Sequence, residues 1–583
     1  MLQLNSTLTA CGLTVLLAAG TAAQAQGPTV TATGLMPARN AVAAPRATNV
    51  VIPFSQAINP ATADSIRVFS AQYRGRRTVA ASTSGSAVTL VPTAPAGQAA
   101  AFRPGETVQV TVPGTVQNMQ GRGGAPYVYQ FTAAATGGTG GFAPGSDVAM
   151  GNGGGYWPEI KVGDLDGDGD LDFAMAYGGY SFSLNNKVKV GLNNGNGMFT
   201  LAPDVTTGDG AEALTLADVD GDGDLDILTG TTLGGSSNPN GVIALVRNTG
   251  SASFAAPVII GTGYVRSIAV GDVDGDGDLD VVAGRVFLND GRGNFALGAA
   301  ASGMALGDVD NDGDLDLVGV TNSTGTVQLN DGHGNFTVGA AFTVAGDKGL
   351  TLGDLDGDGD LDLLTVNFGG GTTALLSIRL NDGTGSFGGT TNLPDGTSAW
   401  CLALGDVDGD GDLDILTPDT GNPMRTHVRF NDGTGDFSRR YTFNNGGTLF
   451  AGIQTVNMAL GDLDSDGDLD LLLVDYTADY VGVRLNGAVL ATAAPQPLPA
   501  GALWPNPASA TQPVQVSLTV PGDVRAVQAT VLNSLGQQVA RATLPVQAGQ
   551  ATGALPTAGL PAGVYVVQLQ AGAQRFSQRL VLL

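Results

Sequence analysis

One nine-residue pattern, D-x-D-x-D-G-D-L-D, occurs seven times and places carboxylates at positions 1, 3, 5, 7 and 9. Alternate oxygens on a tightly curled loop surround a hard cation at about 2.3–2.6 Å, which suits Ca²⁺. Glycine at position 6 permits the left-handed backbone that such a curl requires. An EF-hand would carry a bidentate acid at position 12, where the first two copies have Met175 and Thr229. The loop is therefore predicted to be of the calcium type but to join two strands.

We name the copies repeats 1 to 7 in chain order. The predicted metal-binding residues are the five acids of each repeat, namely Asp164, Asp166, Asp168, Asp170 and Asp172; Asp218, Asp220, Asp222, Asp224 and Asp226; Asp272, Asp274, Asp276, Asp278 and Asp280; Asp308, Asp310, Asp312, Asp314 and Asp316; Asp354, Asp356, Asp358, Asp360 and Asp362; Asp406, Asp408, Asp410, Asp412 and Asp414; Asp462, Asp464, Asp466, Asp468 and Asp470. The alternative is a solvated acidic turn, against which seven copies in one register argue.

The elements that position these loops are predicted to be strands. An apolar run precedes each motif, a second follows it, a third ends in an N-D-G-x-G-like turn, and a fourth leads to the next copy. Short β-branched or Leu-rich runs between such turns are typical of strands. Four strands in about 50 residues predict a seven-bladed β-propeller, with a solenoid as the alternative. Residues 142–150 are predicted to supply the outer strand of the last blade, which would close the ring.

The repeats resemble FG-GAP/VCBS repeats, the family that includes the integrin α-chain propeller. The resemblance implies side-chain ligands at positions 1, 3, 5 and 9, and about seven structural Ca²⁺ ions. Asn311 and Ser465 replace glycine at position 4. We expect both replacements to be tolerated because position 4 is not a ligand.

The composition excludes several classes of protein. The 583 residues carry 53 acidic and 26 basic side chains, a net charge of −27, and 50 of the acids are Asp. This balance argues against nucleic acid or an anionic membrane surface as a partner. The 35 acids of the seven motifs account for all of the net negative charge, because the rest of the chain has 18 acids and 26 basic residues.

The start of the chain is predicted to be a secretory signal peptide, residues 1–25, because an apolar run precedes an Ala-x-Ala-like cleavage site. No later segment has the roughly 20 apolar residues of a membrane span. Cys401 is then the sole cysteine, so disulfides within the mature chain are excluded. We expect metal ions to stabilise this loop-rich secreted chain instead.

Two further β-sandwiches are predicted to flank the propeller. Residues 26–135 alternate apolar and polar side chains and resemble a bacterial Ig-like domain through IPFSQAINPAT and YQFTA. The linker 136–141 leads to the propeller, 142–488, and the linker 489–500 follows it. Residues 501–583 resemble the C-terminal sorting domain of type IX secretion through WPNP, the LGQ turn and the GVY strand. That resemblance implies the type IX machinery as partner and release or attachment outside the cell; the alternative is an ordinary terminal Ig-like domain.

No catalytic constellation is predicted. His333 occupies a turn position that holds Arg292 and Thr384 in sibling repeats, His427 lies in a predicted strand, and Cys401 lies in an apolar run. A polysaccharide lyase or hydrolase on the same scaffold is the alternative to a binding protein.

Strand direction predicts that the metal loops share one face of the ring and that several aromatic residues share the other. Aromatic rings flanked by Asn and Gly suit a sugar or a protein ligand, as in lectins and adhesins, whereas ordinary rim packing is the alternative. The predicted ligand-binding residues are Tyr156, Trp157, Tyr177, Tyr180, Trp400, Tyr476 and Tyr480.

Overall fold

A computed structural model describes most of the residues of this protein. These are residues 26–93, 101–150, 155–179, 186–208, 211–231, 241–263, 265, 267–346, 348–367, 374–396, 399–419, 425–445, 455–475, 480–487, 503–504, 508, 514–519, 526–532, 538–547, 550–571 and 574–582. The predicted signal peptide, the predicted linker 489–500, Tyr180 and Tyr476 lie outside them. No helix within these ranges has the length and apolar character needed to cross a membrane.

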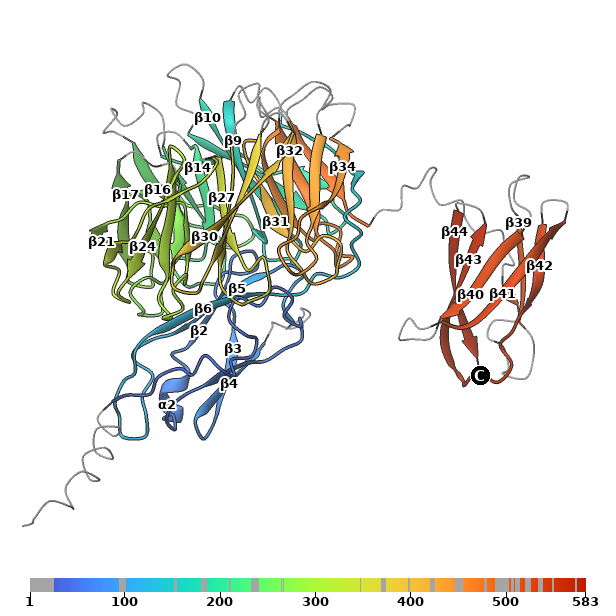
Figure 1. Cartoon of the computed structure of the whole chain (residues 1–583), viewed down its shortest axis with the longest axis horizontal. Helices are drawn as coiled ribbons and strands as arrows, with labels where there is room; N and C mark the ends of the chain where they lie inside the picture. The colour runs from blue at the N-terminus through green and yellow to red at the C-terminus, as the bar shows by residue number, and fades with distance from the viewer. Residues whose placement is uncertain are drawn as a thin grey trace, which may run out of the picture. The chain divides into compact units, whose positions relative to one another are not determined.

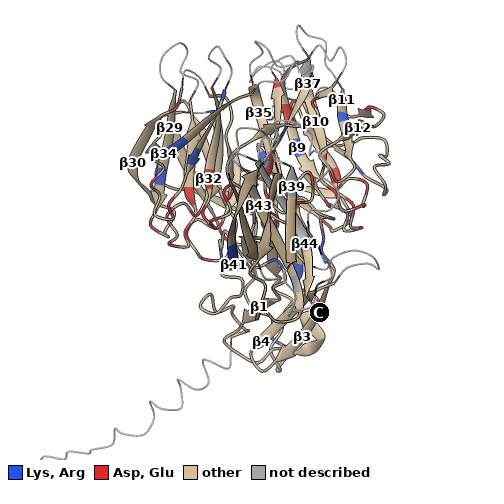
Figure 2. Ribbon diagram, turned by 90° about the vertical axis from the view of Figure 1, so that its right-hand side faces the viewer, with Lys and Arg blue, Asp and Glu red and all other residues tan. Residues whose placement is uncertain are grey.

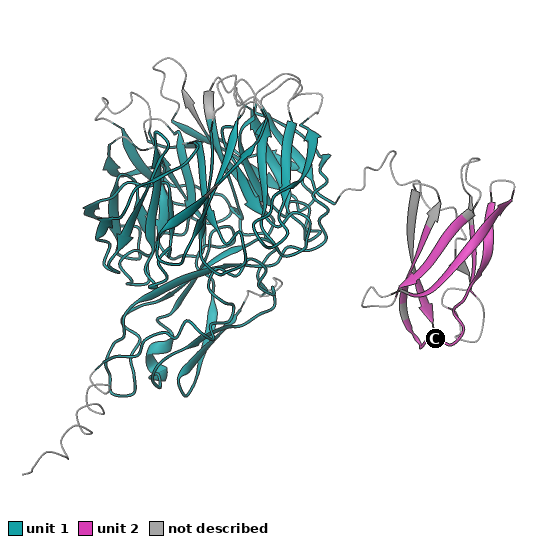
Figure 3. Cartoon of the chain, in the orientation of Figure 1, with its two compact units in different colours: residues 1–489 teal, residues 490–583 magenta. Residues whose placement is uncertain are grey.

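The chain splits into two compact units, residues 1–489 and residues 490–583 (Figure 3). The first unit contains the N-terminal domain and all seven repeats (Figure 1). Strands make up almost all of the regular structure, and the described residues include one short helix, α2 (Pro60–Ala63). The Asp-rich composition therefore accompanies an all-β fold, as the sequence predicts.

The N-terminal domain has two three-stranded antiparallel sheets, in the orders β1-β4-β3 and β2-β5-β6. One buried cluster contains side chains from both sheets, among them Ile52, Leu90, Val110 and Phe131. Two sheets that share one core form a sandwich. The strands are β1 (Val50–Pro53), β2 (Arg67–Ser70), β3 (Val79–Ser84), β4 (Ala87–Pro92), β5 (Thr107–Val112) and β6 (Tyr127–Thr132).

Each repeat forms one antiparallel sheet whose first strand precedes the motif and whose second strand begins at position 9. The strands are β9 (Gly155–Gly163), β10 (Asp172–Gly179), β11 (Lys187–Asn193), β12 (Phe199–Leu201) and β13 (Val205–Thr206) in repeat 1; β14 (Ala213–Ala217), β15 (Asp226–Gly230), β16 (Val242–Val246) and β17 (Val258–Thr262) in repeat 2; β18 (Ala269–Gly271), β19 (Asp280–Val282), β20 (Arg285–Asn289) and β21 (Phe295–Ala300) in repeat 3; β22 (Ala305–Gly307), β23 (Asp316–Thr321), β24 (Thr324–Asn330), β25 (Phe336–Val338) and β26 (Phe342–Thr343) in repeat 4; β27 (Lys348–Gly353), β28 (Asp362–Val366), β29 (Leu375–Asn381) and β30 (Phe387–Pro394) in repeat 5; β31 (Ala403–Gly405), β32 (Asp414–Asp419), β33 (Arg425–Phe430) and β34 (Arg439–Asn444) in repeat 6; β35 (Thr455–Gly461), β36 (Asp470–Asp475) and β37 (Tyr480–Leu485) in repeat 7.

Neighbouring repeat sheets pack face to face. Every residue of β15, β28 and β36 is buried, as expected for strands that are covered on both faces. The first strand of each repeat contacts the first strand of the next, and β35 in turn contacts β9. The first strands of repeats 1, 2, 5, 6 and 7 and the N-terminal domain line a cavity of about 500 Å³, whose polar lining includes Gln72, Gln130, Lys161, Thr215 and Thr351.

The sheet of repeat 7 takes its outer strands from the segment that follows the N-terminal domain. β7 (Ala143–Pro144) and β8 (Val148–Ala149) both pair with β37. Between them, Asp147 Oδ1 lies 2.7 Å from Nη1 of Arg484, whose side chain is 1% exposed. Chain segments more than 300 residues apart thus share one sheet and one buried ion pair.

The second unit is a smaller all-β domain with strand order β38-β39-β42-β41-β40-β43-β44. Its buried cluster includes Val516, Val531, Leu555, Val567 and Leu580, from five of these strands. The bounds are β38 (Leu503–Trp504), β39 (Val514–Thr519), β40 (Ala526–Leu532), β41 (Gln538–Gln547), β42 (Gln550–Leu555), β43 (Gly563–Ala571) and β44 (Gln574–Leu582).

Candidate metal-binding loops

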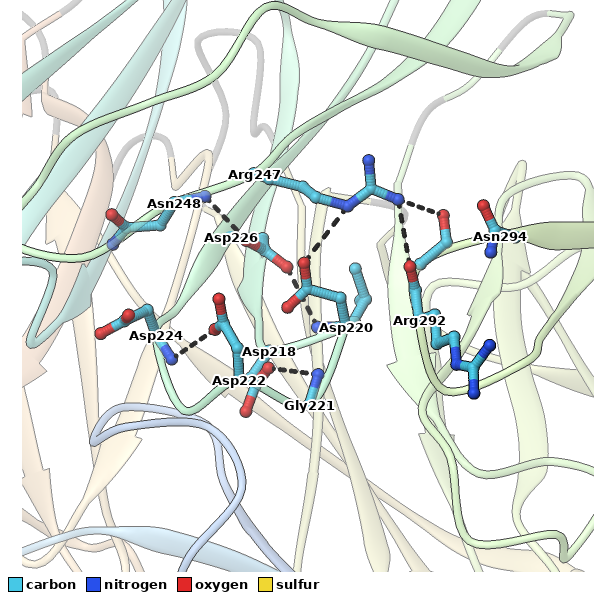
Figure 4. A network of polar contacts seen from close by, with 12 residues as sticks. Asp218, Asp220, Gly221, Asp222, Asp224, Asp226, Arg247, Asn248, Arg292 and Asn294 are labelled. Carbon is cyan, nitrogen blue, oxygen red and sulfur yellow. Dashed lines mark hydrogen bonds and ion pairs between the residues drawn. The ribbon is translucent and has the colours of Figure 1, made fainter.

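The first acid of each motif organises the curl of the loop. In repeat 2, Asp218 Oδ1 accepts a hydrogen bond from Gly221 N at 2.8 Å (Figure 4). Asp218 Oδ2 accepts one from Gly223 N at 3.0 Å. The same two bonds occur in repeats 1, 3, 5 and 6. The fifth position continues the curl, because Asp222 Oδ1 accepts from Asp224 N at 3.0 Å.

Glycine at position 6 has positive φ in all seven repeats, between 89° and 103°, and the left-handed turn is confirmed. Position 4 is also left-handed, which the sequence analysis missed. Asn311 and Ser465 adopt φ values of 67° and 63° there, like the glycines of the other repeats. Whether a residue can replace glycine at position 4 therefore depends on its ability to adopt positive φ, as well as on the absence of a ligand role. Asn adopts this conformation more readily than Ser.

The ninth position ties the loop to two strands. Asp226 Oδ2 accepts from Val219 N at 3.2 Å, and Asp226 Oδ1 accepts from Asn248 N at 2.8 Å. Every repeat repeats both bonds. The leucine before this acid is buried in all seven repeats, as predicted for an anchor of the loop: Leu171, Leu225, Leu279, Leu315, Leu361, Leu413 and Leu469.

The asparagine at the end of the third strand, or one or two residues beyond it, joins neighbouring repeats. Asn248 Nδ2 of repeat 2 donates to Leu165 O in the loop of repeat 1 at 2.7 Å. Asn193 Nδ2 of repeat 1 donates to Leu463 O of repeat 7 at 2.8 Å. The five remaining repeats make the equivalent bond to the preceding loop, through Asn289, Asn330, Asn381, Asn431 and Asn486.

The seventh position faces the turn after the third strand. A Cβ on Gly291 would lie 2.6 Å from both carboxylate oxygens of Asp278, and Gly195, Gly332, Gly383, Gly433 and Gly487 meet their own position-7 acid at similar distances. The glycine of the turn is therefore needed both for its φ of 73° and for space.

Carboxylate oxygens at positions 1, 3 and 9 gather closely enough for one cation. In repeats 1, 2, 4 and 5, ligand atoms from these three positions lie within 4.8 Å of one another; in repeat 3 the grouped acids are those at positions 1, 3 and 5. The Oδ1 atoms of Asp220, Asp308, Asp356, Asp408 and Asp462 are buried without a hydrogen-bond partner. A hard divalent cation fits such a set, because it would bind these buried oxygens, which accept no hydrogen bond.

Burial also raises the pKa values of several loop carboxylates. The pKa of Asp218 is raised to about 6, chiefly by burial and also by the neighbouring Asp222, against backbone hydrogen bonds that lower it. Burial raises the pKa of Asp226 to about 8. A bound cation would favour the ionised carboxylates and oppose both effects.

The N-terminal domain lies on these loops (Figures 1 and 2), which the sequence analysis did not predict. Arg74 Nη2 donates to Gly167 O at 2.9 Å, and Arg76 N donates to Asp218 Oδ2 at 2.9 Å. Val128 N donates to Gly313 O at 2.6 Å. The cluster Arg74, Arg76 and Arg77 was the available sequence signal, since basic residues suit a surface that meets carboxylates.

The predicted ligand face is described only in part. Trp400 precedes β31 and its ring lies 5.8 Å from Nζ of Lys348 at the start of β27, the end of the strand away from the loops. Tyr480 is half-buried at the start of β37. Tyr156, Trp157 and Tyr177 belong to β9 and β10, but their side chains are outside the described part of the structure.

Of the residues weighed for catalysis, Cys401 precedes β31, His427 lies in β33 of the same sheet, and His333 lies on a turn of repeat 4. Cys401 is buried, which raises its thiol pKa, and His333 is exposed on its turn. His427 is buried in β33, where its Nδ1 lies 2.8 Å from Thr442 Oγ1 and its Nε2 lies 3.6 Å from Asp419 Oδ2. Burial lowers the pKa of His427.

Comparison with protein families found three matches. The FG-GAP-like repeat matches residues 178–229, 233–283, 308–365 and 354–417. The bacterial Ig-like domain matches residues 24–133, and the secretion system C-terminal sorting domain matches residues 502–583. All three resemblances expected from the sequence are confirmed, and the sorting domain implies export to the cell surface or beyond.

Comparison with curated proteins found no match. Among solved structures, an Agrocybe aegerita lectin that recognises non-reducing terminal N-acetylglucosamine is 22% identical, with a TM-score of 0.36, and the match covers 55% of this chain and 85% of that one. BBS1N in complex with ARL6DN is 11% identical, with a TM-score of 0.41 and coverage of 59% and 97%. A Bacteroides thetaiotaomicron protein of unknown function is 11% identical, with a TM-score of 0.28 and coverage of 79% and 98%. Structural similarities this low do not indicate which ligand this chain binds.

Proposed function

We propose that this exported FG-GAP-repeat β-propeller protein is a calcium-stabilised binding protein, adhesin-like or lectin-like, whose seven repeat sheets form a closed ring. The buried, unpartnered carboxylate oxygens of the loops support Ca²⁺ as the ion. The acids at positions 1, 3 and 9 would hold it, with position 5 as a further ligand in repeat 3. The bound ion would supply charge compensation and rigidity rather than chemistry.

The position of the N-terminal domain is the observation that carries the binding role. Because that domain hydrogen-bonds to loops of repeats 1, 2 and 4, the loop face of the ring is occupied within the chain itself. A ligand would then bind on the opposite face, where the first strands begin. Trp400 and Lys348 lie there and offer an aromatic surface beside a cation. Such a surface suits the faces of sugar rings or an acidic glycan.

A glycan array probed with the exported protein, in excess calcium and after chelation, tests this proposal. Trp400→Ala and Trp157→Ala should abolish glycan binding without a change in melting temperature. Tyr441→Ala is the matched control, because Tyr441 lies on the outer strand β34 and is 42% exposed. Binding that survives both tryptophan replacements would contradict the proposed face. A parallel assay for products released from polysaccharides tests the lyase or hydrolase alternative.

A further inference from the structure

The position before the asparagine that joins neighbouring repeats distinguishes repeat 2 from its siblings. Six repeats have an apolar residue there, and repeat 2 has Arg247. The apolar residues are Leu192, Leu288, Leu329, Leu380, Phe430 and Leu485. A charged side chain thus replaces a packing residue at one of seven equivalent places.

The apolar siblings of repeats 3 and 4 pack against the turn of the following repeat. A Cβ on Gly334 of repeat 4 would lie 3.4 Å from Leu288 Cδ2, and one on Gly385 of repeat 5 would lie 3.3 Å from Leu329 Cδ2. Arg247 reaches the equivalent turn of repeat 3. Its Nη2 donates to Gly293 O at 2.8 Å and to Arg292 O at 3.2 Å. The guanidinium is therefore held by two carbonyls in the place that leucine fills elsewhere.

The same guanidinium pairs with the metal loop of its own repeat (Figure 4). Arg247 Nε lies 3.3 Å from Asp220 Oδ2, and the two side chains are 26% and 18% exposed. Asp220 is the position-3 acid, and its ligand oxygen groups with those of Asp218 and Asp226. One of the three grouped acids is thus already paired with a fixed positive charge.

Two other arginine side chains for which an ion pair within 4.0 Å of a loop acid is described, Arg439 and Arg39, are placed differently. Arg439 lies 3.0 Å from Asp408 of repeat 6, yet its side chain is 66% exposed and solvent screens the pair. Arg39 of the N-terminal domain lies 4.0 Å from both Asp308 and Asp360. Neither is clamped between a loop and the next turn as Arg247 is.

We propose that Arg247 is a built-in counter-ion that makes the loop of repeat 2 a weaker divalent-cation site than the loop of repeat 3. The proposal rests on the calcium role proposed above. Ligand charge tunes the affinity of oxygen-ligand calcium sites, so a cationic group on Asp220 opposes binding of Ca²⁺. Loss of one effective ligand charge should weaken the site about tenfold.

Hydrogen exchange read by mass spectrometry along a calcium titration of the exported protein resolves individual loops. Protection of the peptide that spans 218–226 should reach its midpoint at about tenfold higher free calcium than that of 272–280. Arg247→Leu, which restores the sibling residue, should lower the 218–226 midpoint about tenfold and leave 272–280 unchanged. Arg292→Gln is the matched control, because it removes the same charge from an exposed turn position and should move neither midpoint.

The converse variant, Leu288→Arg, should raise the midpoint of the repeat 3 loop. An unchanged 218–226 midpoint in Arg247→Leu, with calcium protection of the other loops intact, would overturn the role of Arg247. Loops that gain no protection at any calcium concentration would instead overturn the calcium role itself. The two failures are therefore distinguishable.

Discussion

The two small domains at the ends of this chain are both all-β, yet they relate differently to the repeats. The N-terminal domain belongs to the same compact unit as the repeats and hydrogen-bonds to their loops, whereas residues 490–583 form a unit of their own. Their charges differ as well. Residues 490–583 carry one acid, Asp523, and four arginines, while residues 1–489 carry 52 acids and 22 basic residues.

The difference indicates that the acidity of the protein belongs to one structural unit. The N-terminal domain places backbone donors and arginines on the loops, so it is part of what stabilises them. The C-terminal unit has neither an acidic motif nor, within its described residues, an ion pair. We therefore predict that the stability of the first unit depends on metal ions and that the stability of the second unit does not.

Removal of calcium should have the largest effect, and only on the first unit. With free calcium about tenfold above the dissociation constant, each loop would contribute about 1.4 kcal/mol. Seven loops would contribute about 10 kcal/mol, which is comparable with the stability of a whole domain. Calorimetry in excess EDTA should show a sharp fall in the melting temperature of the first unit and an unchanged transition for the second. Equal shifts of the two transitions, or no shift in either, would contradict this prediction.

Loss of the buried ion pair of repeat 7 should have the next largest effect. Arg484→Leu leaves Asp147 charged and buried, which costs about 3–5 kcal/mol when one partner of a buried pair is removed. Urea unfolding should report this loss in the first unit alone. Arg439→Leu is the control, because its exposed pair with Asp408 should contribute less than about 1 kcal/mol. If both variants lost a similar free energy of unfolding, the burial of Arg484 would not explain how much its ion pair stabilises the protein.

One glycine in each unit offers a smaller and sharper test. Gly291 and Gly559 both have positive φ, at 73° and 84°, but a Cβ on Gly291 would meet Asp278 while one on Gly559 would meet nothing within 4 Å. Gly559→Ala should therefore cost only the left-handed strain of about 1 kcal/mol, and Gly291→Ala about 1–2 kcal/mol more. Thermal unfolding of each unit measures both. If Gly291→Ala lost no more stability than Gly559→Ala, the close packing of the position-7 acid against the turn would be contradicted.

Local, repeated features of the structure could be predicted from the sequence. Motif spacing fixed the strand-loop-strand units, and the left-handed glycine at position 6 and the buried leucine at position 8 followed from single positions such as Gly223 and Leu225. These contacts lie within a few residues of one another, so seven aligned copies reveal them.

The pairing of residues 142–150 with the sheet of repeat 7 was predicted and is confirmed. The contacts between the N-terminal domain and the loops could not be predicted. The bond between Arg76 and Asp218 spans 142 residues, and no periodicity in the sequence relates the two. The bonds from Asn248 and its siblings to the preceding loop were missed for another reason. The asparagine is visible in every repeat, but only the packing of neighbouring sheets shows that its side chain leaves its own repeat.

Removal of residues 490–583 should have the smallest effect on the stability of the first unit. The second unit has its own core, with Val516, Val567 and Leu580 buried within it, and none of the seven motifs lies in it. A chain that ends at residue 489 should therefore melt at the same temperature, and respond to EDTA in the same way, as the first unit of the full chain. The same truncation should abolish export, because it removes the sorting domain. Fractionation of the producing cells measures export, and calorimetry of the purified proteins measures the melt. If residues 1–489 melted several degrees lower without residues 490–583, the second unit would stabilise the first. Both small domains would then contribute to the stability of the repeats.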